Sequence, residues 1–357
     1  MFSPNIRIFT DLFSTSEQDL FCFLDDGFPE AGGDARLTQP LMTMAGGSAV
    51  NSATHLAALE RGDATNGTRP VIVHSVIQPN DEYGKLMLNH MKMHGIPFIN
   101  CLNEKIDTTT ASTGHCIVIV TNNERSFMTH PGVVEGFTAN CVQFGTMAQE
   151  IGPIHVHIAG FYNIRGFWSG ALLEHIQRIR QVREQLTCVS LVTQHDATGE
   201  WNGGLLELLP LLDFVFMNEL EANHITKLNE NDDNITHWIH FFSLAAFATC
   251  VIITRGDLGA IAIRNGKVIA NQAAVKIAPI DPTGAGDAFC SGFLKGIWDW
   301  RQHCPSINTG KEWPPQAIQN GLVHGCGVAT CSVLTRGASV PSDPLHIQDF
   351  ICRTKKL

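Results

Sequence analysis

The chain has 357 residues, of which 44% are hydrophobic and 16% charged, so it is long enough to bury the core of one large α/β domain. Its net charge is −10 and its basic residues are scattered along the sequence, which argues against a nucleic-acid partner. No window reaches the ~18 uninterrupted apolar residues of a membrane span, and the N-terminus lacks a secretory apolar region. We therefore expect neither a membrane segment nor a signal peptide.

The eleven cysteines are odd in number and lack the paired spacing of metal ligands, so they are interpreted as reduced, buried thiols in a cytoplasmic protein. The C-terminal sequence Lys355-Lys356-Leu357 resembles the Ser-Lys-Leu peroxisomal signal but has Lys where a small residue is needed. A frayed basic tail is the alternative interpretation.

Short β-branched runs alternate with longer helical patterns along the chain. The runs that predict strands lie at 71–76, 154–160, 186–192, 214–217 and 250–254. Because they are continuously apolar and separated by helices, they predict a mainly parallel sheet covered by helices on both faces. Residues 48–61 predict an Ala-rich helix that approaches the sheet closely and is capped by Gly62.

Two segments interrupt this alternation. Residues 114–120 and 125–129 are β-rich and joined by a short polar stretch, which predicts a hairpin. Residues 19–24 are extended, and the stretch that follows lacks helical periodicity. We expect these segments, from about 19–44 and 110–131, to form a small β-sheet lid. Residues 116–120 are apolar in both phases, so the second face of the lid packs on another subunit or is covered by the N-terminal segment.

The strongest chemical signal is the sequence DPTGAGD at 281–287, which is followed by a helical apolar pattern. A glycine-rich turn at a helix N-terminus presents free N–H groups and the positive end of the helix dipole to an anion. Gly284, Ala285 and Gly286 are the predicted anion hole, and Asp287 in the first turn is the predicted catalytic base. The alternative is an Asp287 that only complements the helix dipole.

This motif resembles the C-terminal signature of the ribokinase-like, or PfkB-type, carbohydrate kinases. Four further segments match that family in order, and they lie at 46–53, 81–84, 218–221 and 254–260. Together the five matches cover nearly the whole chain. The resemblance implies a single ribokinase-like domain over 1–357, with three α/β/α layers, a mainly parallel sheet and a lid, and with its ATP-binding part at about 215–345. It also implies transfer of the γ-phosphate of ATP to a sugar or nucleoside hydroxyl, with Mg²⁺ and K⁺ as cations.

The resemblance assigns cation and phosphate binding to three residues. Asn218 and Glu221 match the element that organises Mg²⁺ and phosphate, largely through water. The same two residues fit a helix capping box, and both interpretations can hold together. Asp281 lies beside the implied monovalent cation site, which Pro282 alters because the family often has a hydroxyl residue there.

The resemblance places nucleotide at the turn formed by Thr254, Arg255, Gly256 and Gly259, which follows a strand at its C-terminal end. Arg255 is expected either to pair with a phosphate or to lie in solvent. The two glycines fit a tight turn equally well.

At the substrate end, Gly46 and Gly47 leave room for a polyhydroxylated molecule to approach the backbone, and Asn51 offers both donors and acceptors. Asp19 resembles the family's early aspartate that bonds substrate hydroxyls. Its rivals for this role are Asp11, Asp25 and Asp26. Asn163 is interpreted as a solvated loop amide.

The sequence also departs from the family pattern. No glycine follows the first apolar run, residues 6–13, so either that strand is distorted or the sequence lacks an N-terminal part. Val192 stands where many relatives have Asp, and Cys326 where an adenine-side Asn is common, which favours an altered nucleotide preference.

These residues bear on three possible functions. The absence of a G-x-G-x-x-G motif after the first strand excludes a dinucleotide oxidoreductase. A catalytically idle relative that only binds ligand is disfavoured by the intact Asp287. Pentose, hexose, sugar-acid and nucleoside kinases share the same catalytic parts, so the motifs leave the substrate class open.

Overall fold

The structure is a computed structural model. It describes residues 9–13, 17–24, 30–61, 71–102, 111–121, 124–142, 154–183, 187–228, 233–303 and 313–357. Gly62, Asp25 and Asp26 lie outside these ranges. Within them, no helix is both long and apolar enough to cross a bilayer.

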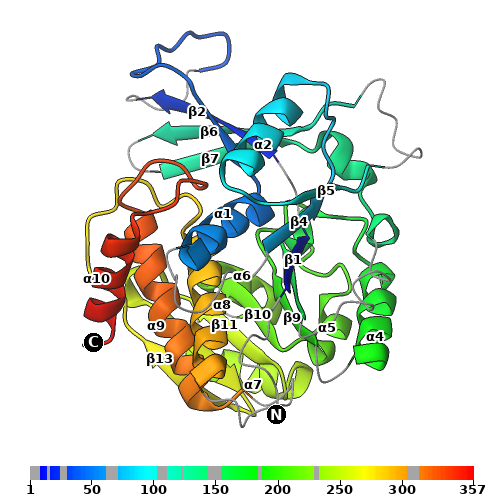
Figure 1. Ribbon diagram of the computed structural model, residues 1–357, viewed down its shortest axis with the longest axis vertical. Helices are drawn as coiled ribbons and strands as arrows, with labels where there is room; N and C mark the ends of the chain where they lie inside the picture. The colour runs from blue at the N-terminus through cyan, green and yellow to red at the C-terminus, as the bar shows by residue number, and fades with distance from the viewer. Residues whose placement is uncertain are drawn as a thin grey trace.

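The larger of two sheets has nine strands in the order β13-β12-β11-β10-β9-β8-β1-β4-β5 (Figure 1). These strands are β1 (Phe9–Phe13), β4 (Val71–Ser75), β5 (Phe98–Asn100), β8 (Ile154–Ala159), β9 (Thr187–Val192), β10 (Phe214–Asn218), β11 (Cys250–Thr254), β12 (Ala260–Arg264) and β13 (Lys267–Gln272). Neighbours from β5 to β11 are parallel, whereas β12 and β13 add antiparallel strands at one edge. The five strands expected from apolar runs are all present.

The first strand is regular. It pairs in parallel with β4 on one side and β8 on the other, with Thr10 opposite Val71 and Phe9 opposite Ile154. A strand with neighbours on both sides has its backbone groups satisfied by the sheet whether or not a glycine follows it. The distortion considered for this strand is therefore wrong.

Helices cover both faces of this sheet. They are α1 (Ser48–Arg61), α2 (Glu82–Met93), α4 (Ala171–Arg183), α5 (Leu205–Leu208), α6 (Glu219–Thr226), α7 (Asn234–Ala245), α8 (Ala285–His303), α9 (Pro315–Ser332) and α10 (Pro344–Thr354). Successive residues of β10 point to opposite faces, so Val215 and Met217 pack in the core beneath α4 to α7, while Phe214 and Phe216 pack against α8 and α9. This two-sided burial confirms the expected three-layer α/β/α arrangement.

The second sheet has four strands in the order β3-β2-β6-β7 and stands at the top of Figure 1. Its strands are β2 (Glu17–Leu24), β3 (Met42–Gly46), β6 (Gly114–Thr121) and β7 (Glu124–His130). It joins the predicted hairpin to the predicted extended segment, so the expectation of a small second sheet is confirmed. We refer to this sheet as the lid.

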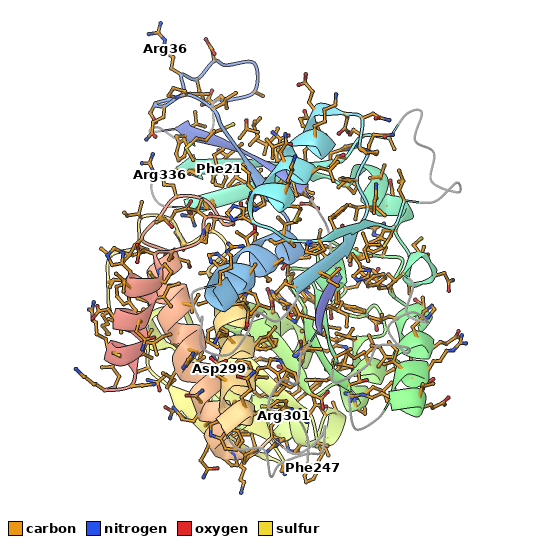
Figure 2. The ribbon with its side chains drawn as sticks, in the orientation of Figure 1. Phe21, Arg36, Phe247, Asp299, Arg301 and Arg336 are labelled. Atoms are coloured by element: carbon orange, nitrogen blue, oxygen red, sulfur yellow. The ribbon has the colours of Figure 1, made fainter. Side chains whose placement is uncertain are left out.

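The inner face of the lid contacts a loop near the C-terminus. Figure 2 labels Arg336 on this loop, and its guanidinium carbon lies 5.3 Å from the centre of the Phe23 ring. A Cβ on the next residue, Gly337, would stand 2.3 Å from Cε of Met44, so the absence of a side chain there lets the lid approach closely. The lid therefore rests on the larger domain in this conformation.

The outer face of the lid is covered in part by α2. The Tyr83 ring of α2 lies 4.8 Å from the His115 ring of β6. Ile119 on the same face is buried, whereas Met128 is 49% exposed. The second apolar face is thus partly covered within the described chain, and the dimer contact stays a prediction.

Candidate active site

The glycine-rich loop leads directly into α8. Gly284 has φ +74°, and a Cβ on it would stand 2.6 Å from the Cβ of Ala338, so the position requires glycine. Gly286 and Asp287 lie in the first helical turn, where backbone N–H groups have no acceptor within the helix. Nothing lies within 4 Å of the place where a Cβ of Gly286 would be. Of the predicted anion-hole residues, Ala285 has its N–H bonded to the carbonyl oxygen of Pro282 at 3.2 Å. The anion hole stays a prediction.

Asp287 is held by two donors from α1. Ser48 Oγ donates to one carboxylate oxygen at 2.5 Å, and Asn51 Nδ2 donates to the other at 2.9 Å. Burial raises the pKa of Asp287 to about 6, although both hydrogen bonds lower it. A carboxylate with this pKa is mostly ionised at neutral pH, yet it binds a proton more readily than an ordinary Asp. Ser48 was not anticipated as a site residue, although it directly follows the glycine pair of the N-terminal motif.

Asp19 lies against the glycine pair. A Cβ on Gly46 would stand 2.2 Å from Oδ2 of Asp19, so only glycine leaves room for this carboxyl group, and Gly47 adopts φ +84° at the entry to α1. Asp19 is 8% exposed. Burial, with the nearby Glu17, Asp287 and Asp281, raises its pKa to about 8. The structure thus brings Asp19, the glycines and Asn51 to one place. Asp11 is one of the alternatives to Asp19 for bonding substrate hydroxyls. It lies in β1, whose side chains the structure does not describe.

Asp281 connects the lid to the glycine-rich loop that precedes α8. Its Oδ1 lies 3.0 Å from Nη2 of Arg125 in β7 and accepts the N–H of Thr283 at 2.9 Å. Its Oδ2 accepts the N–H of Gly337 at 2.9 Å. The sequence placed Arg125 on a hairpin strand but gave no sign of its partner, which lies far along the chain.

Asn218 and Glu221 form the capping box at the start of α6. Glu221 N donates to Asn218 Oδ1 at 2.8 Å, and the backbone N–H of Asn218 donates to Glu221 Oε2 at 3.1 Å. Asn218 Nδ2 also donates to Glu221 Oε1 at 2.8 Å. Thr193, which follows β9, donates its hydroxyl to Glu221 Oε2 at 2.8 Å. Burial raises the pKa of Glu221, and the Thr193 hydrogen bond opposes that shift. The capping interpretation is confirmed, while metal and phosphate binding stay predictions. Thr193 carried no sequence signal.

The predicted nucleotide turn follows β11. Thr254 Oγ1 lies 3.5 Å from the carbonyl oxygen of Met217. Arg255 lies with its Nε 3.3 Å from Oε1 of Glu219, and pairing with a phosphate stays a prediction. Gly259 has φ +93°, and a Cβ there would stand 1.9 Å from the carbonyl oxygen of Gln272.

Gly256 also lies in the left-handed region, at φ +56°. Both glycines of this turn therefore have a backbone reason for their presence, whatever the turn binds.

Asn163 and Cys326 also have local partners. Asn163 Nδ2 donates to Gln194 Oε1 at 2.5 Å, so this amide bonds a neighbouring loop. Cys326 is buried, with its sulfur 3.9 Å from the carbonyl oxygen of Gln272.

The described residues contain no group of three or more His, Cys, Asp or Glu side chains that could hold a metal ion by themselves. Asp281 and Glu221 therefore do not form a protein-only cation site. Mg²⁺ in phosphoryl-transfer sites is commonly bound by one or two carboxylates together with substrate phosphates, so this arrangement fits a metal that arrives with nucleotide.

The three-layer fold and a buried carboxylate in the first turn of α8 define an α/β protein with a candidate site at the start of that helix. The chain belongs to the pfkB family of carbohydrate kinases, whose model matches residues 25–344. This match confirms the resemblance found in the motifs and the class of enzyme it implies, a phosphotransferase acting on carbohydrates or nucleosides.

The matched relatives include nucleoside kinases and fructoselysine 6-kinases. Adenosine kinase 1 of Arabidopsis thaliana is 26% identical over 278 residues, which are 74% of this chain and 72% of that enzyme. Adenosine kinase of Dictyostelium discoideum is 26% identical over 57% of this chain, and the match spans 61% of that enzyme. Fructoselysine 6-kinase of Escherichia coli is 26% identical over 70% of this chain and 80% of the enzyme.

Solved structures agree on the fold. Ribokinase of Giardia lamblia superposes with a TM-score of 0.75 at 18% identity, covering 97% of this chain and 99% of that one. Adenosine kinase of Sinorhizobium meliloti gives a TM-score of 0.70 at 18% identity over the same shares of the two chains.

Proposed function

We propose that this protein transfers the γ-phosphate of ATP to a hydroxyl group of a sugar or nucleoside, with Asp287 as the catalytic base. The observation that carries this proposal is the position of Asp287 in the first turn of α8. There the buried carboxylate stands beside N–H groups of the glycine-rich loop that lack acceptors within the helix.

In the proposed reaction, the substrate hydroxyl oxygen forms a bond to the γ-phosphorus, the bond from that phosphorus to the β-γ bridging oxygen breaks, and ADP leaves. Asp287 takes the hydroxyl proton. Ser48 and Asn51 fix both oxygens of the carboxylate, so its orientation is set before substrate arrives. N–H groups at Gly286 and Asp287 stabilise the charge on the transferring phosphoryl oxygens.

Bound Mg²⁺ would supply charge neutralisation on the phosphates, and Glu221 with Asn218 would hold it through water. Asp281 fits a K⁺ ion poorly. Its carboxylate already carries the Arg125 guanidinium and two backbone N–H groups, so it has little free charge to offer. We assign potassium no role.

The sugar and nucleoside alternatives share this machinery, and the relatives include both adenosine kinases and fructoselysine 6-kinases. An idle ligand-binding relative is the second candidate from another class. The pKa of Asp287, raised to about 6, favours an active base over a purely structural residue.

The test is an ATP-consumption assay on the purified chain with a panel of pentoses, hexoses, sugar acids and nucleosides, paired with a thermal-shift screen of the same compounds. The proposal expects ADP release that depends on one class of acceptor and on Mg²⁺. A compound that raises the melting temperature while no acceptor stimulates ADP release would instead identify an idle binding protein.

The outer face of the lid supports a homodimer, because Met128 stays exposed beside buried apolar neighbours. Light scattering at micromolar concentration tests this, and a monomeric mass would contradict it. The described cysteines are all free thiols, which supports the proposed cytoplasmic location because disulfides are rare in cytosolic proteins.

A further inference from the structure

Arg125 lies on the inner face of the lid. It pairs with Val120 across β6 and β7, and directly opposed residues of an antiparallel pair point to the same face of a sheet. Val120 packs against the buried cluster of Phe21, Cys116 and Val118 on that face. The Arg125 side chain is charged, yet it is only 14% exposed. The lid therefore presents a largely buried cation to the large domain.

Asp281 receives this cation and joins two loops. Its Oδ1 atom lies 3.0 Å from Nη2 of Arg125 and accepts the N–H of Thr283. Its Oδ2 atom accepts the N–H of Gly337. Asp281 itself is 6% exposed. One buried carboxylate thus holds together the lid, the loop before α8 and the loop at Gly337.

A potassium ion and Arg125 are alternatives at this carboxylate. Potassium is bound by oxygen atoms that replace its hydration shell. Here both oxygens of Asp281 already accept N–H donors, and the Arg125 guanidinium provides the positive charge. A second cation beside Arg125 would be repelled, since like charges interact strongly in a buried site. The implied monovalent cation therefore has its place taken by a side chain of the protein.

Compensation of Asp281 matters because the groups around it at the cleft include further acids. The charges of Asp281 and Asp287 both raise the pKa of Asp19, so these carboxyls act on one another. Without Arg125, Asp281 would carry an uncompensated buried charge close to where the γ-phosphate is proposed to lie. The proposed transfer therefore needs a cation at Asp281.

This cation is delivered by the lid. Arg125 belongs to β7, whereas Asp281 and Gly337 belong to the large domain. Next to Gly337 in the same loop, the hydroxyl of Ser339 donates to the carbonyl oxygen of Ala45 on β3 at 2.6 Å. A lid that moves away from the large domain separates Arg125 from Asp281 and breaks the Ser339 bond. Charge compensation at Asp281 is thereby tied to closure of the lid.

We propose that Arg125 is a positioning residue that supplies, from the lid, the positive charge that a bound potassium ion would otherwise supply at Asp281. The protein accordingly works without potassium, and lid closure sets the arrangement of the loops that carry Asp281 and Gly337. This inference rests on the proposed function and goes beyond it by naming what takes the place of the implied ion.

The first test compares the unaltered protein in potassium, sodium and N-methylglucammonium chloride at equal ionic strength and saturating Mg²⁺, with the acceptor found in the ATP-consumption assay. The kcat/KM is expected to agree within about twofold in the three salts. Stimulation by potassium beyond that range overturns the inference and leaves the proposed kinase function intact.

The second test asks whether Arg125 acts through Asp281. Arg125→Ala is expected to lower kcat at least about tenfold, the value of a hydrogen bond to a charged group, with a smaller change in KM. In the Asp281→Asn background no charge needs compensation, so the same substitution should lower kcat by less than about twofold. Equal losses in both backgrounds overturn the inference, because they place Arg125 directly on the substrate phosphates.

The third test supplies the cation from solution. Millimolar guanidinium or potassium is expected to raise kcat of Arg125→Ala about fivefold or more, since either can stand beside the exposed carboxylate. Arg125→Lys keeps the charge and should lose less activity than Arg125→Ala. Arg336→Ala is the matched control, because Arg336 also contacts the lid but bonds the amide oxygen of Gln39, and any loss it causes should not respond to guanidinium. Failure of both cations to restore Arg125→Ala contradicts the proposed role.

Thermal unfolding checks that each variant is folded and gives a readout that needs no acceptor. Millimolar guanidinium is expected to raise the melting temperature of Arg125→Ala and not that of the unaltered protein, because only the variant leaves Asp281 without a cation. An equal response in both proteins counts against the inference, whether or not an acceptor is phosphorylated. The absence of any phosphorylated acceptor counts against the proposed function. If Arg125→Ala does not fold, the salt comparison on the unaltered protein still decides.

Discussion

Two buried carboxyl groups, Asp213 and Asp287, are held in contrasting ways. Asp213, just before β10, pairs with Nη2 of Arg180 at 2.5 Å and accepts the N–H of Val189 at 2.7 Å. Asp287, at the start of α8, receives only neutral donors from Ser48 and Asn51. The charge of Asp213 is compensated by a cation, whereas that of Asp287 is stabilised by hydrogen bonds alone.

The same contrast holds for the neighbouring groups. In the core beneath α8, Trp298 donates to His155, and the hydroxyl of Ser190 lies within 2.7 Å of nitrogens of both His155 and His157. At the cleft, Glu17 and Asp19 have no hydrogen-bonding partner among the described residues. The histidine cluster therefore satisfies part of its hydrogen-bonding capacity within the chain, although Nε2 of His157 has no partner among the described residues.

The largest expected effect breaks the compensated pair. Asp213→Asn leaves the Arg180 guanidinium buried without a counter-charge, so the free energy of unfolding is expected to fall by about 3–5 kcal/mol. Urea titration measures it. Asp349→Asn removes the exposed partner of Arg353 and is the control, with a change below about 0.5 kcal/mol. Equal small losses in both variants would contradict a structural role for the Asp213 pair.

The next prediction concerns the uncompensated carboxylate. Asp287→Asn is expected to lower turnover by roughly a hundredfold or more while ATP and substrate affinities change by a few-fold, because a base acts mainly in the transition state. Steady-state kinetics with Asp349→Asn as control would show this. Unchanged turnover removes Asp287 from its role.

Asp287→Asn is also expected to change the free energy of unfolding, in the direction opposite to Asp213→Asn. Folding raises the pKa of Asp287 from 3.8 to about 6, so the folded state binds more protons between these values and stability falls as pH rises through this window. The asparagine lacks this cost. Above pH 6, Asp287→Asn is expected to melt no lower than the parent protein in a thermal scan.

A smaller effect tests the histidine cluster beneath α8. Burial lowers the pKa of His157 to about 3, so the folded state keeps this imidazole neutral. As pH falls from about 6.5 toward 3, the unfolded state binds a proton here that the folded state does not, and the free energy of unfolding decreases. Each such group costs at most about 1.4 kcal/mol per pH unit. His157→Gln is expected to flatten the decline of unfolding free energy between pH 6.5 and 5. A decline as steep as that of the parent would place the acid sensitivity elsewhere.

The smallest expected change concerns Mg²⁺. Glu221→Gln removes one carboxylate charge, so the Mg²⁺ concentration for half-maximal rate is expected to rise several-fold. Glu219→Gln, on the same turn but paired with Arg255, is the matched control. If both variants give the parent's Mg²⁺ titration, Glu221 is only a helix cap.

The sequence alone determined the local architecture. Apolar runs such as 154–160 and 250–254 predicted strands because burial on both faces of a parallel sheet requires continuous hydrophobicity. The glycines of the two motifs marked the turns beside Asp19 and Asp287, since a required positive φ or a close approach leaves a single-residue signature. These features are recorded in a few consecutive residues and can therefore be recognised without the fold.

The tertiary structure alone decided which side chains meet. Ser48 and Asp287 are 239 positions apart in the sequence, and nothing in the local pattern at either position names the other. The same holds for Arg125, which reaches Asp281 from the lid, and for Arg255, whose guanidinium lies beside Glu219. Side-chain pairing depends on how strands and helices are placed in space. A hydrophobic pattern fixes which face of each element is buried, but it does not fix which polar groups at their ends become neighbours.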